Sequence, residues 1–79
     1  MKKTIYTEDQ KRLRNLLKSA RLEAGLTQEQ LAERLSVPQS FVSKYESGER
    51  KLDLIELRNI CRALGISLLS FVRQFDESL

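Results

Sequence analysis

Residues 26–50, LTQEQLAERLSVPQSFVSKYESGER, contain two short helical patterns that follow each other almost without a gap. The first, TQEQLAERL, opens with Thr27 and Gln30 at the spacing of a capping box, in which each side chain satisfies the other residue's backbone N–H. Pro38 fixes its own φ and disfavours helical backbone in the residue before it, so it predicts the start of a second helix that runs to about Ser47. Only about three residues separate the two helices. They must therefore cross at a steep angle.

A longer helix is predicted before this segment. Apolar residues recur there at the spacing of one helix face, i, i+3, i+4, i+7 and i+11: Leu13, Leu16, Leu17, Ala20 and Ala24. Thr7 and Gln10 offer a capping box for its start, and Gly25 offers a stop at its end.

Two further helices are predicted after the segment. Asp53 opens the first of them with a capping box, and its inward stripe consists of Leu54, Leu57, Cys61 and Leu64. Gly65 ends that helix, and Ser67 can cap a last one through LLSFVRQF. The sequence thus predicts an all-α chain of five helices, of which the second and third form a helix-turn-helix.

Composition removes most catalytic chemistry from consideration. The 79-residue chain has no histidine and a single cysteine, Cys61, so it lacks the groups for His-based acid–base catalysis, nearly all zinc sites and an internal disulfide. We therefore expect no enzymatic activity, no metal and no cofactor. A chain this short also leaves little room for a deep pocket, so no small-molecule ligand is expected.

The chain also shows no sign of membrane association. It has no run of about 18 apolar residues, and MKKTIYTEDQ at its start lacks the apolar stretch of a secretory signal. We expect a cytoplasmic protein with one domain, residues 1–79, and a core from about residue 10 to 75. Residues 1–21 carry seven Lys/Arg and two acidic residues, a net +5. Such a helix can lie along phosphates, but a solvated helix face has the same composition, so charge alone does not settle the function.

The outer face of the helix after Pro38 carries the chemistry of a DNA reader. Gln39, Ser40, Ser43, Lys44 and Ser47 share this face, which has no carboxylate. A helix fits the major groove, where Gln can pair with adenine, Lys can donate to guanine, and Ser can serve either base. An ordinary solvated face is polar as well, so the connection between the two helices carries more weight than polarity.

The motif elements TQ-x-x-LA, QS-x-VSK-x-E and SGER, followed by ICRALGIS, resemble the phage repressor and Cro type of helix-turn-helix, also called the xenobiotic-response-element (XRE) family. The resemblance covers roughly residues 10–75. It implies a compact five-helix, lambda-repressor-like DNA-binding domain. Ser36 departs from the pattern, because the family's turn often has Gly there; a positive φ at a non-glycine residue costs about 1 kcal/mol.

The resemblance also implies a role for individual residues. It places four residues against base edges: Gln39, Ser40, Ser43 and Lys44. It places five along the DNA backbone: Thr27, Gln28, Ser47, Arg50 and Lys51. Gln28 matches a position that touches the backbone or braces the first recognition residue. Arg21 and Glu46 match a structural pair that ties the first helix to the third.

These observations predict a sequence-specific, double-stranded-DNA-binding transcriptional regulator, acting as a dimer on a pseudo-palindromic operator. The alternative is an antitoxin-type protein or a restriction–modification controller, whose partner or operon context defines its role. No appended tail follows the last helix beyond DESL, which counts against an antitoxin that wraps a toxin.

The last helix is expected to form the homodimer interface. Its apolar residues spread around more than one face, more than a single domain can cover. Leu68, Val72 and Phe75 can pack inward, which leaves Leu69 and Phe71 in need of cover, or the two roles can be exchanged. The expected interface consists of Leu69, Phe71, Val72 and Phe75. Two-fold pairing would set two recognition helices about 34 Å apart; in the alternative, the last helix merely completes the core of a monomer.

Overall fold

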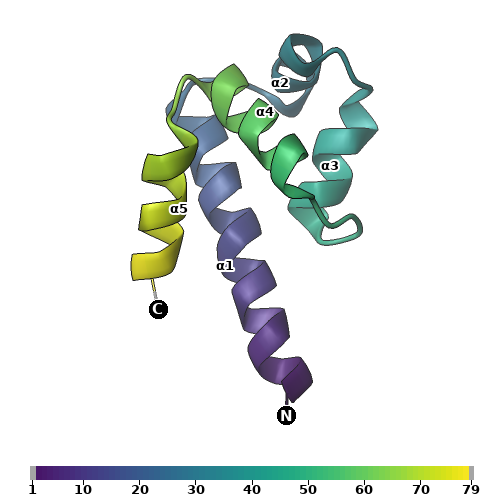
Figure 1. The fold of residues 1–79 in the computed structure, drawn as a ribbon. Coiled ribbons are helices and arrows are strands. Elements are labelled where there is room, and N and C mark those ends of the chain that lie inside the picture. The colour runs from purple at the N-terminus through teal and green to yellow at the C-terminus, as the bar shows by residue number, and fades with distance from the viewer. Residues whose placement is uncertain (1, 79) are drawn as a thin grey trace.

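The computed structural model describes the backbone of residues 2–78 and the side chains of residues 7–78. Five α-helices follow one another along this part of the chain (Figure 1): α1 (Lys2–Glu23), α2 (Gln28–Leu35), α3 (Gln39–Ser47), α4 (Leu54–Leu64) and α5 (Leu68–Glu77). No strand occurs among the described residues. The prediction of an all-α, five-helix fold is confirmed.

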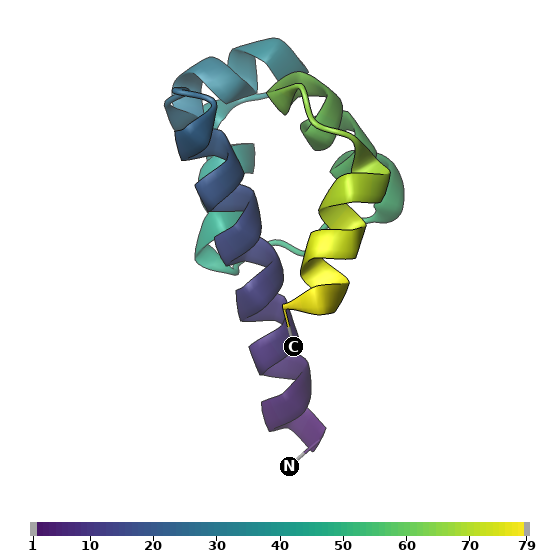
Figure 2. The ribbon, with the colours of Figure 1, turned by 90° about the vertical axis from the view of Figure 1, so that its left-hand side faces the viewer.

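The helices are arranged around the long α1. α2 packs on α3 and α4, while α1 packs on α3 and α5. Figure 1 shows α4 between α5 on one side and α3 on the other, and α5 runs back along α1 from the turn after α4. Figure 2 shows α2 bridging α1 and α4 at one end of the molecule. This arrangement leaves one side of α3 uncovered.

Every helix contributes to the core. The buried residues are Leu17, Leu31, Ala32, Val42, Tyr45, Ile60, Cys61, Leu64 and Phe71. Burial of one large apolar side chain stabilises a fold by about 1.5–3 kcal/mol, so these residues fix how the helices sit relative to α3. Burial also raises the pKa of the Cys61 thiol, which keeps it protonated and unreactive.

Two details of the predicted helices are wrong. α1 already runs from Lys2, so Thr7 lies inside the helix and does not cap it; no Gly or Pro interrupts the preceding residues. In α4, Leu54 is 66% exposed, whereas Ile60 is fully buried. Because α4 packs against both α2 and α5, its inward direction includes Ile60 and turns away from Leu54.

The turn between α2 and α3 depends on a left-handed residue. Ser36 has φ 59° and ψ 43°, the conformation that the family's usual glycine adopts at no steric cost. Its N–H donates to the carbonyl of Glu33 at 3.1 Å, and the N–H of Val37 donates to the carbonyl of Ala32 at 3.0 Å. These bonds end α2 and turn the chain into α3.

The orientation of α5 differs from the expectation in one important respect. Phe71 is 3% exposed and belongs to the core, so its expected place in a dimer interface is wrong. Leu68 packs against the same core, and Phe75 is half-buried. Leu69 and Val72 are 71% and 40% exposed. Phe71 points inward because α5 packs against both α1 and α4, and this rotation turns Leu69 and Val72 outward.

The part of the chain that the structure describes contains neither a membrane span nor a metal-binding cluster. None of its helices combines the length and the apolar character needed to cross a bilayer. No three potential metal-ligating side chains gather among the described residues.

Candidate nucleic-acid interface

The uncovered side of α3 carries the residues expected to read DNA. Val42 and Tyr45 are buried on the opposite side of the helix and anchor it in the core. We call the uncovered side the reading face; it consists of Gln39, Ser40, Ser43, Lys44 and Ser47, of which Ser43 is half-buried and the others are exposed. The Ser47 hydroxyl donates to the Lys44 carbonyl at 3.1 Å and so helps to close the end of the helix.

A buried ion pair fixes α3 against α1. The Arg21 guanidinium donates to both carboxylate oxygens of Glu46, from Nε at 2.8 Å and from Nη2 at 3.0 Å. The two side chains are only 7% and 4% exposed. Arg21 also donates from Nη1 to the Leu26 carbonyl at 2.8 Å, which ties the pair to the segment before α2. The hydrogen bonds to Glu46 raise the pKa of Arg21, so the guanidinium stays charged.

A chain of hydrogen bonds leads from this ion pair to the reading face. Gln28 Nε2 donates to Glu46 Oε1 at 3.0 Å, and Gln39 Nε2 donates to Gln28 Oε1 at 3.0 Å. An ionised carboxylate only accepts hydrogen bonds, so Gln28 must turn its NH₂ group toward Glu46 and its oxygen toward Gln39. Gln39 must then turn its own NH₂ group toward Gln28.

The consequence is a fixed pattern of donor and acceptor at the tip of Gln39. One of its two N–H groups is used by Gln28, which leaves its second N–H and its Oε1 for a partner outside the chain. Adenine presents an N–H donor at N6 beside an acceptor at N7 in the major groove, and an oriented Gln amide matches both. The chain of bonds thus leaves Gln39 with a free donor beside a free acceptor, a pattern that is complementary to the adenine edge.

The start of α2 lies next to this network. Thr27 caps the helix: its hydroxyl accepts from the Gln30 N–H at 3.0 Å, and its own N–H donates to Gln30 Oε1 at 2.9 Å. Because this capping box uses the Thr27 N–H, the anion-attracting groups here are the first N–H groups of the helix itself. The predicted capping box is confirmed.

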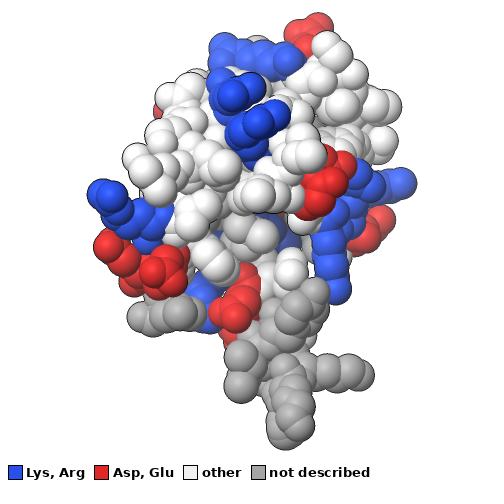
Figure 3. Space-filling view, in the orientation of Figure 1, with Lys and Arg blue, Asp and Glu red and all other residues white. Residues whose placement is uncertain are grey.

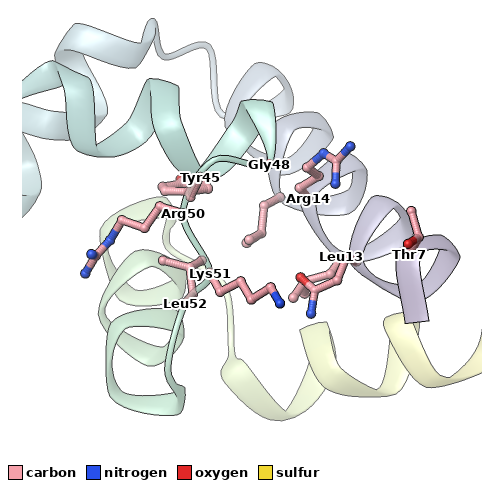
Figure 4. Close-up of a pocket in the computed structure, with 10 residues that line it drawn as sticks. Thr7, Leu13, Arg14, Tyr45, Gly48, Arg50, Lys51 and Leu52 are labelled. Carbon is pink, nitrogen blue, oxygen red and sulfur yellow. The ribbon is translucent and has the colours of Figure 1, made fainter. Parts of the chain in front are cut away.

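The loop after α3 adds positive charge. Arg50 forms an ion pair with Glu56 and lies over the Phe41 ring, 4.8 Å from its centre. Lys51 is exposed, and its side chain extends toward α1 along a small hollow of about 210 Å³, while Arg50 points away from the hollow (Figure 4).

Arg14 of α1 was not among the predicted site residues. A Cβ placed on Gly48 would lie 3.0 Å from its Cζ, which puts the guanidinium directly against the end of α3. The helix dipole favours a cation at this end. The basic surplus of residues 1–21 is the signal in the sequence that could have indicated such a contact.

These features define a helix-turn-helix with a braced recognition helix. The family model described as helix-turn-helix matches residues 17–71, which include both helices of the motif and most of the core. The chain therefore belongs to the helix-turn-helix family, in its phage repressor and Cro, or XRE, type.

Two relatives carry a name from the same family. A protein of Methanothermobacter thermautotrophicus named "Uncharacterized HTH-type transcriptional regulator" is 38% identical over 65 residues, which cover 82% of this chain and 94% of that protein. The HTH-type transcriptional regulator y4dJ of Sinorhizobium fredii is 38% identical over 58 residues, which cover 73% of this chain and 75% of that protein. Along most of its length, this chain is thus similar to HTH-type transcriptional regulators.

Solved structures share the whole architecture. An XRE-family like protein from Pseudomonas syringae pv. tomato superposes with a TM-score of 0.91 at 43% identity, covering 98% of this chain and 94% of that one. The wild-type restriction-modification controller protein C.Esp1396I superposes with a TM-score of 0.81 at 28% identity, covering 87% and 88% of the two chains. A third structure holds this controller as a tetramer with its natural 35 base-pair operator, with a TM-score of 0.80 at 28% identity and coverage of 87% and 91%.

Proposed function

We propose that this member of the helix-turn-helix regulators binds a specific DNA operator through the reading face of α3. The observation that carries this proposal is the chain of hydrogen bonds from Glu46 through Gln28 to Gln39, because it orients an exposed amide before any DNA is bound. Side chains that are held in place before binding lose less entropy on binding. Gln39 reads adenine, and its neighbours on the same face contact the adjoining base edges: Ser40, Ser43 and Lys44.

The DNA backbone is held from both ends of this motif. The N-terminus of α2, with Thr27 and Gln28, receives a phosphate through its uncapped N–H groups and its positive dipole end. At the other end, Ser47, Arg50 and Lys51 follow the neighbouring phosphates. Contacts of this kind set the position of the protein on the duplex and carry no sequence information.

The regulator acts as a homodimer whose contact is built on α5. Leu69 and Val72 form an exposed apolar strip there, and the half-buried Phe75 borders it. Two copies related by a two-fold axis would set their recognition helices about one DNA turn apart, which matches a pseudo-palindromic operator. The operator complex of the controller protein C.Esp1396I contains a tetramer, so a protein of this fold places several copies on one DNA.

A role as a restriction–modification controller is a second candidate. The likeness to C.Esp1396I over most of both chains favours it. Restriction and methylation genes beside this one would support the role, whereas an adjacent toxin gene would indicate an antitoxin. For either role we expect a cytoplasmic protein of one domain, residues 1–79, without enzymatic activity.

Selection of binding sites from random duplexes tests the proposed function. The wild type should return a pseudo-palindrome with adenine at one position of each half-site. Gln39→Ala should lose the preference at that position, because the amide that matches adenine is gone. Lys51→Ala should weaken binding and return the same motif, because a phosphate contact carries no sequence information. An unchanged motif from Gln39→Ala would contradict the assignment of Gln39.

A further inference from the structure

A shallow groove lies between the C-terminal parts of α2 and α4. Its volume is about 380 Å³, and the described residues that line it are Arg34, Leu35, Asn59, Arg62 and Ala63. None of these residues belongs to the reading face of α3. We call this hollow the α2–α4 groove.

The α2–α4 groove and the reading face are reached from opposite ends of α2. Gln28, in the first turn of α2, is bonded to Gln39 on the reading face, whereas Arg34 and Leu35 end the helix. A rise of 1.5 Å per residue sets these two ends about 10 Å apart. Figure 1 shows the end of α4 beside α2 at the top of the molecule, with α3 below them. A ligand in the groove therefore leaves the reading face open.

The rim of the groove carries hydrogen-bond donors that the fold does not use. Arg34 donates from Nη1 to the Ala63 carbonyl at 3.0 Å, which holds its guanidinium over the end of α4. Its remaining N–H groups, and those of Arg62, form no side-chain hydrogen bond or ion pair with any described residue. The helix dipoles favour cations at these C-terminal ends, but they leave the donors without acceptors. A guanidinium is a planar fork of donors that matches a carboxylate.

Positive charge prevails around the groove. None of the described residues that line it is acidic. Arg58, one turn before Arg62 on α4, is exposed and forms no ion pair within the described part of the chain. Glu33 precedes Arg34 and is exposed, yet it pairs with none of these arginines. Figure 3 shows basic side chains gathered over the upper part of α4, where it meets α2. Such a patch attracts an anionic partner.

The floor of the groove is apolar, which distinguishes between kinds of anion. Leu35 and Ala63 are half-buried and pack against the core. A nucleic-acid backbone would bring charge to the arginines but no apolar group to this floor. An acidic stretch of polypeptide brings both, because its carboxylates and its apolar side chains lie within a few residues of each other.

We propose that the α2–α4 groove binds an acidic segment of a partner protein. Its carboxylates pair with Arg34 and Arg62, and an apolar side chain of the segment covers Leu35 and Ala63. Pairs of this kind are frequently bidentate, and their charge-assisted hydrogen bonds are about twice as strong as neutral ones. Because the reading face stays open, a chain that is bound to DNA holds this partner at the same time.

Fluorescence anisotropy with a short labelled peptide in which Glu and Leu alternate tests the proposal. The wild type should bind this peptide at least about tenfold more tightly than the same peptide with Gln in place of Glu, which offers no charge-assisted bonds. Arg62→Gln should weaken binding of the Glu peptide about tenfold, and the fold should tolerate it because Arg62 bonds to no described side chain. Arg34→Gln should weaken it as well. This variant also loses the bond to Ala63, so circular dichroism establishes that it is folded.

Matched controls separate the groove from net charge. Arg73→Gln removes the same charge from an exposed position of α5, and Lys18→Gln removes it from α1; neither residue lines the groove. Both variants should bind the Glu peptide like the wild type. Equal affinity of the wild type for the two peptides, unchanged binding by Arg62→Gln, or an equal loss in Arg73→Gln would overturn the proposal.

A titration in the presence of DNA tests the position of the groove. With the duplex selected by the wild type at saturation, and at a salt concentration that screens its charge, the Glu peptide should bind within about threefold of its affinity for the free protein. If the duplex displaces the peptide, the groove belongs to the DNA interface and the proposal is overturned. The titrations without DNA do not depend on the proposed function, so a failure of specific DNA binding leaves their outcome unchanged.

Discussion

Gln28 and Glu46, 18 residues apart in sequence, are joined by a hydrogen bond of 3.0 Å between the Gln28 Nε2 and a carboxylate oxygen that is held by Arg21. This bond determines which way the Gln28 amide faces, and through it the direction of Gln39. A buried structural pair thereby affects an exposed residue that is proposed to read bases. Variants at these positions separate the effect of the buried pair on stability from its effect on DNA recognition.

The Arg21–Glu46 pair is predicted to couple strongly in folding. Arg21→Met leaves the buried Glu46 carboxylate without its ion-pair partner, and Glu46→Gln does the same to the Arg21 guanidinium. Each substitution should therefore lower the free energy of unfolding by about 3–5 kcal/mol. The double variant should cost less than the sum of the two. Urea denaturation of all four proteins gives the coupling energy, and a value near zero would show that the pair does not act as a unit.

Gln28→Met is predicted to affect DNA specificity more than stability. Methionine keeps the length of the side chain, but it has no N–H group to donate to Glu46 and no amide oxygen to accept from Gln39. The Gln39 amide is then free to turn over. The preference for adenine at the Gln39 position should fall by about 1–3 kcal/mol. Competition binding with single base-pair substitutions measures this preference. As a control, Gln30→Met alters the capping box of the same helix and should leave base preference unchanged.

Stability is predicted to fall at alkaline pH partly through Tyr45. Burial raises the pKa of this phenol above the ordinary value of 10.0, so the folded chain holds the proton more tightly than the unfolded chain. The stability that this difference provides is fully present below pH 10 and is lost as the pH rises above it. Tyr45→Phe should therefore lose less stability between pH 9 and pH 11 than the wild type (roughly the window that a phenol sets). Urea denaturation across this range checks it; parallel losses would contradict the assignment. Cys61, whose pKa is also raised by burial, is present in both proteins and cancels in the comparison.

Substitutions of Phe71 and Leu69 are predicted to affect different properties, the stability of the fold and the strength of the dimer. Phe71→Ala removes a core side chain and should cost about 3–5 kcal/mol of unfolding free energy. Leu69→Glu, on an exposed position, should leave thermal unfolding of the monomer nearly unchanged and weaken the proposed dimer. Sedimentation and thermal unfolding of both variants distinguish the effects. A destabilised Leu69→Glu monomer would show that Leu69 supports the fold of its own subunit.

Local chemistry explains which parts of this molecule could be predicted from sequence. The capping boxes at Thr27 and Asp53 involve residues three apart, and Pro38 acts on its immediate neighbours, so α2, α3 and α4 start where the sequence indicates. The side of a helix that faces inward depends on where its neighbours lie. Helical spacing alone therefore predicts Leu54 as inward-facing and Phe71 as part of an interface, whereas Leu54 is exposed and Phe71 is buried.

In the site, too, features set by local spacing could be predicted from the sequence, whereas contacts between distant residues could not. The exposed face of α3 follows from helical spacing alone, because buried and exposed residues alternate there with the helix period. The Arg21–Glu46 pair was expected only through the resemblance to a family, since it joins residues 25 apart. The bond between Gln28 and Glu46 had no signal in the sequence. It exists because α2 and α3 cross steeply and bring Gln28 over Glu46.

Specific DNA binding through the reading face of α3 can be measured by fluorescence anisotropy on two duplexes across a range of salt. One duplex carries the site selected by the wild type and the other a scrambled version of it. The wild type should prefer its site by at least about 10³-fold, and its log affinity should fall with log salt at a slope of about −5 to −7 for roughly 6–8 phosphate contacts. Gln39→Ala combined with Lys44→Ala should lose most of the preference and keep its salt-dependent binding to the scrambled duplex. Equal affinity of the wild type for both duplexes would contradict specific DNA binding through α3, and an affinity that does not respond to salt would contradict the phosphate contacts.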